Sequence, residues 1–286
     1  KIKENDPDVK RLAQEMEAEL GQGNTYPDLL PKLARFELAL RRFVDENLGS
    51  RQYAAFANKC WPAFESAFGF VPCYVNSRLA ADGIPAACEV DIYGALSEYI
   101  CTLATDLPAT LLDINNTVPD DMIDSKSDLK GACKQDLFMG FHCGNTPSCC
   151  MKQCTMKYQL IMNRLIEDPQ CPPNITRGTL EGQLKPGPIT LFRLQGRAED
   201  GLESYIAQGN CLDIDPKSFG GIGIIGVPNF ARFYRHVLIE KHFPHHAAVG
   251  FSQCGKTLFD ALKLLGIENI HTPLPAGVLY KTENPF

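Results

Sequence analysis

The chain has 286 residues, of which 44% are hydrophobic and 22% charged, and its net charge at pH 7 is −6. These proportions are ordinary for a globular protein, and the negative charge gives no electrostatic reason to expect nucleic acid or an anionic membrane as a partner. No apolar run reaches the roughly 18 residues that a membrane span needs. The first residue is Lys1, and no signal-peptide core follows it, so we expect a piece of a longer protein.

The twelve cysteines are scattered along the chain instead of forming a small disulfide scaffold. Several lie in apolar segments, such as Cys88 and Cys101, where a free thiol behaves as a small buried hydrophobe. This distribution predicts a reducing, cytoplasmic location. Two glycosylation-like triplets, at 115–117 and 174–176, are too short and common to change that prediction.

The first hundred residues alternate between helical and strand patterns. Asp6 and Pro7 predict a helix start, apolar residues follow at helical spacing, and Gly21 marks the stop. Further helices are predicted over 33–48, 74–81 and 91–103, the last capped by Asp91, and short buried strands over 53–56, 85–88 and 109–113. This alternation predicts part of a parallel α/β layer, which we assign to residues 1–108.

The sequence pattern changes after about residue 115, from alternating helices and strands to long polar stretches and strands. Polar stretches over 116–130 and 168–188 predict long loops, and 189–193 is the clearest of several strands. We therefore predict a second domain over 109–286 that is strand-rich, mixed or antiparallel, and barrel-like. The fold class is α/β.

Two glycine-rich segments match nucleotide-binding patterns. Residues 250–257 read GFSQCGKT, a literal phosphate-loop pattern, but the rest of the chain has no later strand ending in an acid that could hold magnesium. Residues 221–226 read GIGIIG, yet no good strand precedes them and no helix start follows, as a dinucleotide fingerprint requires. We interpret the first as a plain strand–turn–helix and the second as a glycine-rich bend in β structure.

Two acids follow apolar strands. Glu89 comes directly after the predicted strand 85–88, and Asp113 ends the strand that begins at 109. Ligands bind at the carboxyl ends of parallel strands, so both acids would face one crevice if both strands lie in one sheet. The alternative is that each is a helix cap or a turn residue.

Histidines flank two other apolar runs. His142 ends the run 137–141, and the pair His245-His246 leads into 247–249. One member of such a pair must face inward and needs a partner there. A satisfied core histidine is the alternative. Carboxylates together with an imidazole can hold a divalent metal ion.

Five segments, in their order and spacing, resemble the L-fucose isomerase-related branch of the L-fucose/L-arabinose isomerase family. They are CWPAF at 60–64, GIPAACEVD at 83–91, FHCGNTP at 141–147, PHHAAV at 244–249 and LYKTENPF at 279–286. The resemblance runs from near residue 7 to the C-terminus. It implies the C-terminal half of a metal-dependent aldose–ketose isomerase that acts on a monosaccharide and forms a homo-oligomer, a trimer or hexamer, at full length.

The resemblance also implies roles for particular residues. Glu89, Asp113 and His246 would hold Mn²⁺, or another divalent cation such as Mg²⁺ or Co²⁺, and His142 falls where arabinose isomerases have a further ligand. Glu89 and Asp113 would alternate as general base and acid in a proton transfer through a cis-enediol. The candidates for the sugar pocket are Trp61, Asn145 and His245, although a core aromatic explains Trp61 equally well.

The chain departs from the family in length, since members are about twice as long and their amino-terminal domain completes the site of a neighbouring subunit. We therefore expect the chain to bind metal better than it turns over sugar. One alternative is a catalytically inactive, sugar-binding member. Another is a cysteine-ligated metal-binding module built on Cys143, Cys149, Cys150 and Cys154, whose spacing fits no zinc or iron–sulfur pattern.

Overall fold

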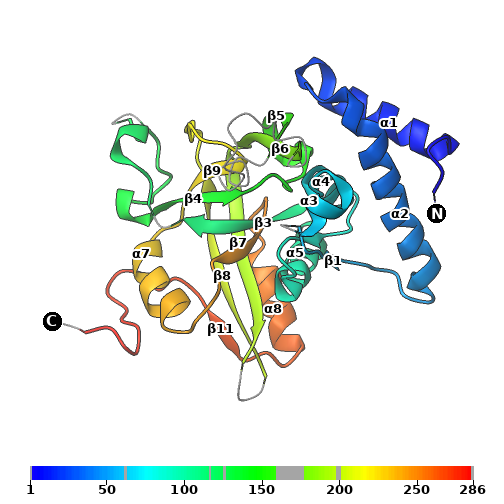
Figure 1. Cartoon of the computed structure of the whole chain (residues 1–286). Helices are drawn as coiled ribbons and strands as arrows, with labels where there is room; N and C mark the ends of the chain where they lie inside the picture. Colours follow the sequence, from blue (N-terminus) through cyan, green and yellow to red (C-terminus); the bar gives the residue numbers. More distant parts are fainter. Residues whose placement is uncertain are drawn as a thin grey trace.

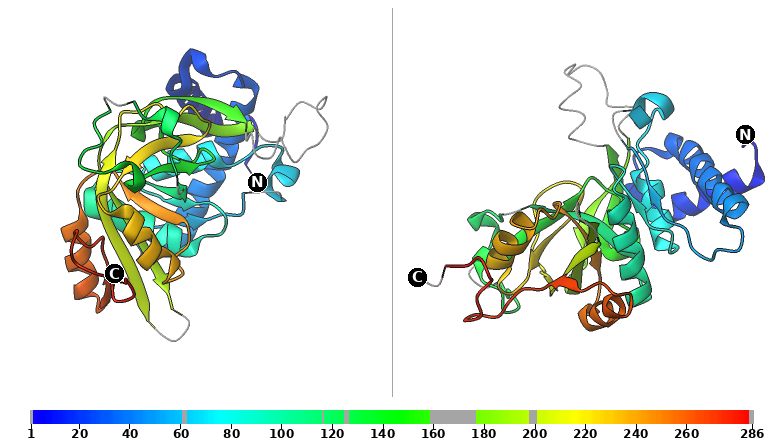
Figure 2. Two further views of the ribbon diagram at one scale, coloured as in Figure 1. Left: turned by 90° about the vertical axis from the view of Figure 1, so that its left-hand side faces the viewer. Right: turned by 90° about the horizontal axis from the view of Figure 1, so that it is seen from below.

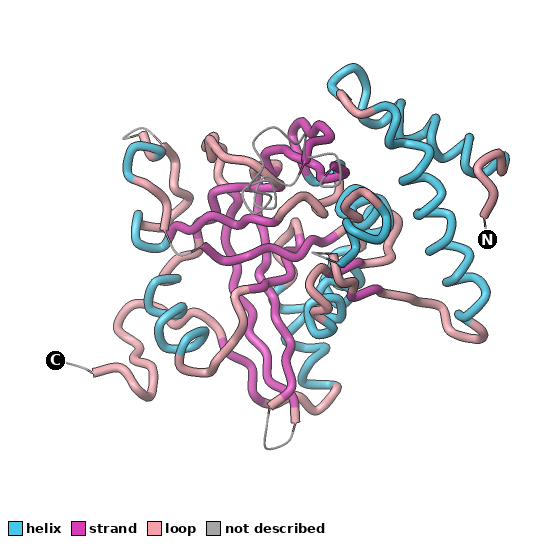
Figure 3. The backbone as a smooth tube through the Cα atoms, in the orientation of Figure 1, coloured by secondary structure: helices cyan, strands magenta, loops and turns pink. Residues whose placement is uncertain are grey.

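The structure is a computed structural model that describes residues 2–60, 63–115, 117–124, 127–158, 177–197 and 201–284. A nine-stranded sheet forms the centre, a two-stranded parallel sheet lies beside it, and the helices lie around them (Figures 1 and 3). This mixture confirms the predicted α/β class. Among the described helices, none is both long and apolar enough to cross a membrane.

Helices α1 (Pro7–Leu20) and α2 (Leu30–Leu48) pack side by side at one flank of the molecule (Figure 1). As predicted, the Asp6 side chain caps α1 by accepting a hydrogen bond from Asp8 N at 3.0 Å, and Gly21 ends it at φ 59°. Arg78 in α4 (Cys73–Ala81) ties both helices down, because its guanidinium lies 2.6 Å from carboxylate oxygens of Glu19 and Glu37.

The parallel pair consists of β1 (Phe56–Ala57) and β2 (Ala86–Ala87), with α3 (Ala63–Phe68), α4 and α5 (Ile92–Thr105) nearby. The predicted strand over 53–56 is wrong in its bounds. Pairing begins only at Phe56, and the side chain of Tyr53 is exposed, because 51–55 forms no ladder. The division into domains at residue 108 stays a prediction.

Six antiparallel strands of the large sheet close into a barrel, visible from below in Figure 2. In ring order they are β3 (Ala109–Asn115), β4 (Leu137–His142), β9 (Gly221–Gly226), β8 (Leu202–Cys211), β7 (Gly187–Gly196) and β10 (His246–Gly250). Pairing of Asn210 with Gly226 joins β8 to β9 and completes the ring. The predicted barrel-like, strand-rich part is confirmed.

Three further strands extend this ring. They are β5 (Met151–Tyr158), β6 (Arg177–Leu184) and β11 (Asn269–His271). Among the described residues after 200, the helical segments are α7 (Phe230–Phe233), the π-helical η6 (Tyr234–Ile239) and α8 (Gly255–Leu264). Short 3₁₀ turns are η1 (Gly21–Gly23), η2 (Pro27–Leu29), η3 (Asp120–Met122), η4 (Lys134–Asp136) and η5 (Ser148–Cys150).

The loop predicted over 168–188 is wrong where it can be compared. Residues 177–184 form β6, which pairs with β5 and β9, whereas 168–176 lie outside the described residues. The bend predicted over 221–226 is also wrong, since this segment is the regular, buried strand β9. A Cβ at Gly223 would lie 2.9 Å from Cys211 Sγ, so its glycines allow close packing of neighbouring strands and no bend is needed.

The phosphate-loop match is a strand–turn–helix, as interpreted. It runs from β10 into α8, and the hydroxyl of Thr190 fills the hydrogen-bonding positions of the turn. This hydroxyl donates to Ser252 O at 2.7 Å and accepts from Cys254 N at 3.0 Å. The Ser252 carbonyl and the Cys254 amide of this turn therefore form hydrogen bonds with a side chain of the protein itself.

Replacing Gly144 with Ala is expected to lower the free energy of unfolding by about 3 kcal/mol. Gly144 lies at φ +132°, and an added Cβ would lie 2.4 Å from the backbone oxygen of Leu180. Urea denaturation measures the loss. Gly266→Ala is the matched control, because Gly266 is also left-handed (φ +76°) but faces open space, so only about 1 kcal/mol of backbone cost is expected. Equal losses in the two variants would contradict the prediction.

Candidate metal centre

Three distant segments bring their side chains together at one end of β10. His246, the first residue of β10, pairs across the ladder with Asp113 of β3. Its Nε2 atom lies 3.1 Å from Asp113 Oδ1 and 3.8 Å from an oxygen of Glu89, which follows β2. The predicted acids and histidine therefore share one site, and they are brought there by strand register and a turn.

The route by which the two acids meet differs from the expected one. Asp113 lies within β3, not after it, and β3 is antiparallel to both of its neighbours. Strand β2 belongs to the separate parallel pair. The condition that both strands lie in one parallel sheet is therefore not met, and the antiparallel register with β10 places Asp113 opposite His246 instead.

The turn that carries Glu89 has a strained backbone. Glu89 and Val90 lie in the left-handed region at φ 62° and 59°, which is rare for any residue with a side chain and especially for a β-branched one. Such strain costs roughly 1–3 kcal/mol per residue and is concentrated at functional sites. Hydrogen bonds from Val90 N to Asn58 O (3.0 Å) and from Asp91 N to Cys88 O (3.1 Å) hold the turn.

Unsatisfied polar atoms meet at the centre of the site. His246 Nε2 and Asp113 Oδ1 are buried, and among the described residues neither atom has a partner with hydrogen-bond geometry. A buried polar atom left without a partner costs about 1–3 kcal/mol. Two overlapping groups have ligand atoms within 4.8 Å of one another, namely Glu89, His142 and His246, and Asp113, His245 and His246. Carboxylate oxygens with imidazole nitrogens fit a divalent cation such as Mn²⁺ or Mg²⁺.

The charges around His246 favour a cation. Burial acts to lower the pKa of His246, but the carboxylates of Asp113 and Asp91 outweigh it and raise the pKa to about 9. Burial likewise acts to raise the pKa of Asp113, yet the neighbouring histidines hold that pKa below its ordinary value. The Asp113 carboxylate therefore remains ionised at neutral pH.

His142 is buried on β4, with its ring centroid 5.8 Å from that of His246. Its Nδ1 atom accepts a hydrogen bond from Cys143 N at 2.9 Å, which puts the proton of the neutral ring on Nε2. Burial lowers the pKa of His142 and so favours that neutral form. This tautomer offers a hydrogen-bond donor to the site, and the role of His142 as a metal ligand stays a prediction.

The three predicted sugar-binding residues differ in their surroundings and in whether the structure describes them. The side chain of His245 is 60% exposed and its Nε2 atom lies 3.5 Å from Asp113 Oδ1, so it is at the centre and open to solvent. Asn145 is buried, and its side-chain oxygen has no partner among the described residues. Trp61 lies outside the described residues.

Two functional candidates were missed by the sequence analysis. Asp91 was interpreted only as a helix cap, and its carboxylate also lies 2.9 Å from His246 Nδ1. Arg193, a buried arginine on β7, forms a two-pronged ion pair with Asp91. The available signals were an acid two residues after Glu89 and an arginine at the end of the apolar segment 189–193.

The cysteine-ligated alternative gains no support. Within the described ranges, neither of the groups that could hold a metal contains a cysteine. Cys149 Sγ and Cys150 Sγ lie 4.0 Å apart, and Cys150 Sγ also lies 3.8 Å from the backbone oxygen of Pro108. The observed candidate centre uses oxygen and nitrogen atoms.

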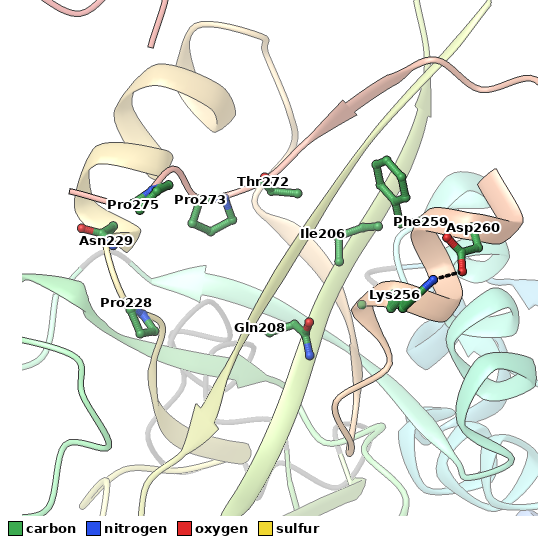
Figure 4. A pocket seen from close by; sticks show the side chains of 11 residues that line it. Ile206, Gln208, Pro228, Asn229, Lys256, Phe259, Asp260, Thr272, Pro273 and Pro275 are labelled. Atoms are coloured by element: carbon green, nitrogen blue, oxygen red, sulfur yellow. Dashed lines mark hydrogen bonds and ion pairs between the residues drawn. The ribbon is translucent and has the colours of Figure 1, made fainter. Parts of the chain in front are cut away.

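A cavity of about 700 Å³ lies elsewhere in the molecule, between β8, α8 and the segment after β11 (Figure 4). Gln208 and Phe259 line it, together with the ion pair of Lys256 and Asp260. None of the predicted site residues contributes to this cavity. The cavity is therefore separate from the candidate metal centre, and we keep the assignment of the site at His246.

Residues 140–271 match the family described as L-fucose isomerase, C-terminal domain. Sulfoquinovose isomerase of Alkalicoccus urumqiensis is 30% identical over 222 residues, 76% of this chain and 43% of that protein. The sulfoquinovose isomerases of Clostridium sp. (strain MSTE9), 30% identical over 66% of this chain and 37% of that protein, and of Priestia aryabhattai, 24% over 86% and 49%, are also similar. The chain thus spans about half or less of the length of these relatives. It belongs to the L-fucose isomerase-related family, and it contains the C-terminal domain of that family.

Proposed function

We propose that this chain carries the metal-binding catalytic part of an aldose–ketose isomerase of the L-fucose isomerase type. The observation that supports this most directly is the position of His246 Nε2, which lies 3.1 Å from Asp113 Oδ1 and 3.8 Å from a Glu89 oxygen. The names of the similar proteins support a sugar isomerase and make sulfoquinovose the first substrate to test.

Glu89, Asp113 and His246 would hold the cation, for which Mn²⁺ is the first candidate and Mg²⁺ or Co²⁺ the alternatives. When bound, such an ion polarises the adjacent carbonyl and hydroxyl oxygens of an open-chain sugar. His245 is open to solvent, and the side-chain oxygen of Asn145 has no hydrogen-bond partner in the described part of the chain, so both are candidates to contact the sugar. Trp61 remains a candidate for an apolar wall of the pocket.

The proton transfer falls to the two acids. The lowered pKa of Asp113 keeps its carboxylate ionised and able to accept a proton from the sugar carbon beside the carbonyl. The side chain of Glu89 is 44% exposed, so it can take up a proton from solvent and return it to the neighbouring carbon. The hydroxyl proton passes to the former carbonyl oxygen, and Asp113 releases the proton that it accepted to solvent, so the proton count is unchanged. Exchange of these roles in the reverse direction gives the cis-enediol route through which aldose and ketose interconvert.

We further infer a cytoplasmic enzyme that acts as a homo-oligomer, a trimer or hexamer, at full length. The described cysteines are free thiols, which fits a reducing compartment. The divided domain arrangement, with a break near residue 108, belongs to the same proposal.

Incubation of the protein with Mn²⁺ and sugar in D₂O tests the function. Sulfoquinovose and L-fucose are supplied in parallel, and proton NMR follows loss of the C–H signal beside the carbonyl. We expect exchange that a chelator abolishes and Mn²⁺ restores. Exchange that is insensitive to the chelator would contradict the metal-dependent route. Binding of sugar without any exchange, even when the amino-terminal domain of the family is supplied, would favour the inactive, sugar-binding alternative.

A further inference from the structure

The two ring nitrogens of His246 face different carboxylates. Nε2 faces Asp113 and Glu89, whereas Nδ1 lies 2.9 Å from Asp91 Oδ2. In an imidazole, the hydrogen bond made by one nitrogen decides which form the other presents. An ionised carboxylate only accepts, so Nδ1 keeps its proton toward Asp91, and Nε2 is the nitrogen that gives up its proton and presents its lone pair when a cation binds.

The Asp91 carboxylate has no position left for a cation of its own. Asp91 Oδ1 accepts hydrogen bonds from Gly94 N and from Arg193 Nη2, each at 2.8 Å. Asp91 Oδ2 accepts hydrogen bonds from Arg193 Nη1 at 2.6 Å and from His246 Nδ1 at 2.9 Å. A carboxylate offers about four lone-pair positions, and all four are used. Asp91 therefore differs from Asp113, whose buried Oδ1 has no hydrogen bond from any of the described residues.

Three elements hold this carboxylate in place. It caps α5, Arg193 reaches it from β7, and His246 reaches it from β10. Arg193 is only 4% exposed, so its ion pair is buried and weakly screened. A Cβ on Gly94 would lie 2.4 Å from Asp91 Oδ2, so position 94 leaves the room that the carboxylate needs.

We propose that Asp91, clamped by Arg193, is the positioning residue that fixes the ring and the tautomer of His246 so that Nε2 faces the cation. The inference rests on the proposed function, because it assumes that His246 is a ligand. Carboxylates that orient metal-binding histidines in this way typically change metal affinity 10–100-fold, which is about the effect expected here.

Two variants test the inference without depending on one another. Asp91→Asn combined with Arg193→Gln removes both charges together, so no unpaired buried charge remains, and Asn still caps α5. Gly94→Ala displaces the Asp91 carboxylate and leaves every charge in place. If the double variant fails to fold, Gly94→Ala decides the outcome.

The readouts are Mn²⁺ affinity, from the electron paramagnetic resonance of free Mn²⁺, and the Nδ1–H proton signal of His246 in protein loaded with Mg²⁺. We expect each variant to bind Mn²⁺ about 10–100-fold more weakly. The Nδ1–H signal should move upfield or be lost to solvent exchange. Asp106→Asn, at the other end of α5, is the matched control and should change neither readout.

The outcomes separate the inference from the function on which it rests. If wild type binds Mn²⁺ and His246→Gln does not, the metal centre stands. Unchanged affinity and an unchanged Nδ1–H signal in the variants would then overturn the positioning role alone. If wild type and His246→Gln bind Mn²⁺ equally, the metal centre is wrong and the inference falls with it.

Discussion

Replacing Asp113 with Asn is expected to reduce the rate of sugar C–H exchange by a factor on the order of 10⁴, the upper end for loss of a general acid or base. The substitution removes the negative charge of the carboxylate that faces His246 Nε2 at 3.1 Å, and with it both an anionic ligand and a proton acceptor. We also expect Mn²⁺ to bind at least about 100-fold more weakly, since a ligand is lost and not merely its support. Exchange in D₂O and Mn²⁺ resonance measure the two effects.

Asp260→Asn is the control for this experiment. Asp260 lines the 700 Å³ cavity of Figure 4 and pairs with Lys256, so its loss tests whether that cavity is the sugar site. We expect Asp260→Asn to leave both exchange and Mn²⁺ affinity unchanged. A large loss in Asp260→Asn with near-normal Asp113→Asn would contradict the assignment of the site.

Local patterns in the sequence predicted much of the fold. Helix α1 begins with its cap at Asp6 and ends before Gly21, as its pattern indicates, because caps and apolar spacing act over a few residues. The same holds for α5 with its cap at Asp91. Closure of the barrel through β8 and β9 was predicted only as a class, because no local pattern states which distant strands will pair.

The candidate site, like the fold, was predictable only in part from the sequence. The resemblance predicted that Glu89, Asp113 and His246 share one site. The structure brings them together through two separate sheets and not through a single parallel sheet. The position of Asp113 opposite His246 depends on antiparallel register between segments far apart in the chain. The left-handed turn at Glu89 was also beyond prediction, because Glu and Val both disfavour that conformation and only the surrounding bonds impose it.

A buried acid next to this site should make the stability of the protein depend on pH. Glu98 of α5 is 1% exposed, and its Oε2 atom has no hydrogen-bond partner among the described residues. Burial, with a smaller contribution from the charge of Asp91, raises the pKa of Glu98 from 4.5 to about 8. In the folded protein this carboxyl therefore stays protonated at pH 7, whereas in the unfolded chain it ionises near its ordinary pKa.

The sign of the effect follows from proton binding. The folded state holds the Glu98 proton more tightly, so its contribution to stability is complete below about pH 4.5 and is lost as pH rises to about 8. The loss amounts to about 1.4 kcal/mol per pH unit within that window. Glu98→Gln cannot ionise, so we expect its unfolding free energy to rise relative to wild type by about 4 kcal/mol between pH 5 and 8.

Urea denaturation of wild type and Glu98→Gln at a series of pH values measures this difference, and groups unaffected by the substitution cancel in it. The exposed acid Glu46 on α2 provides the matched control. Glu46→Gln should differ from wild type by no more than about 0.5 kcal/mol throughout the range. A difference between Glu98→Gln and wild type that stays constant from pH 5 to 8 would show that Glu98 titrates alike in the folded and unfolded chain, and the account of its burial would then be wrong.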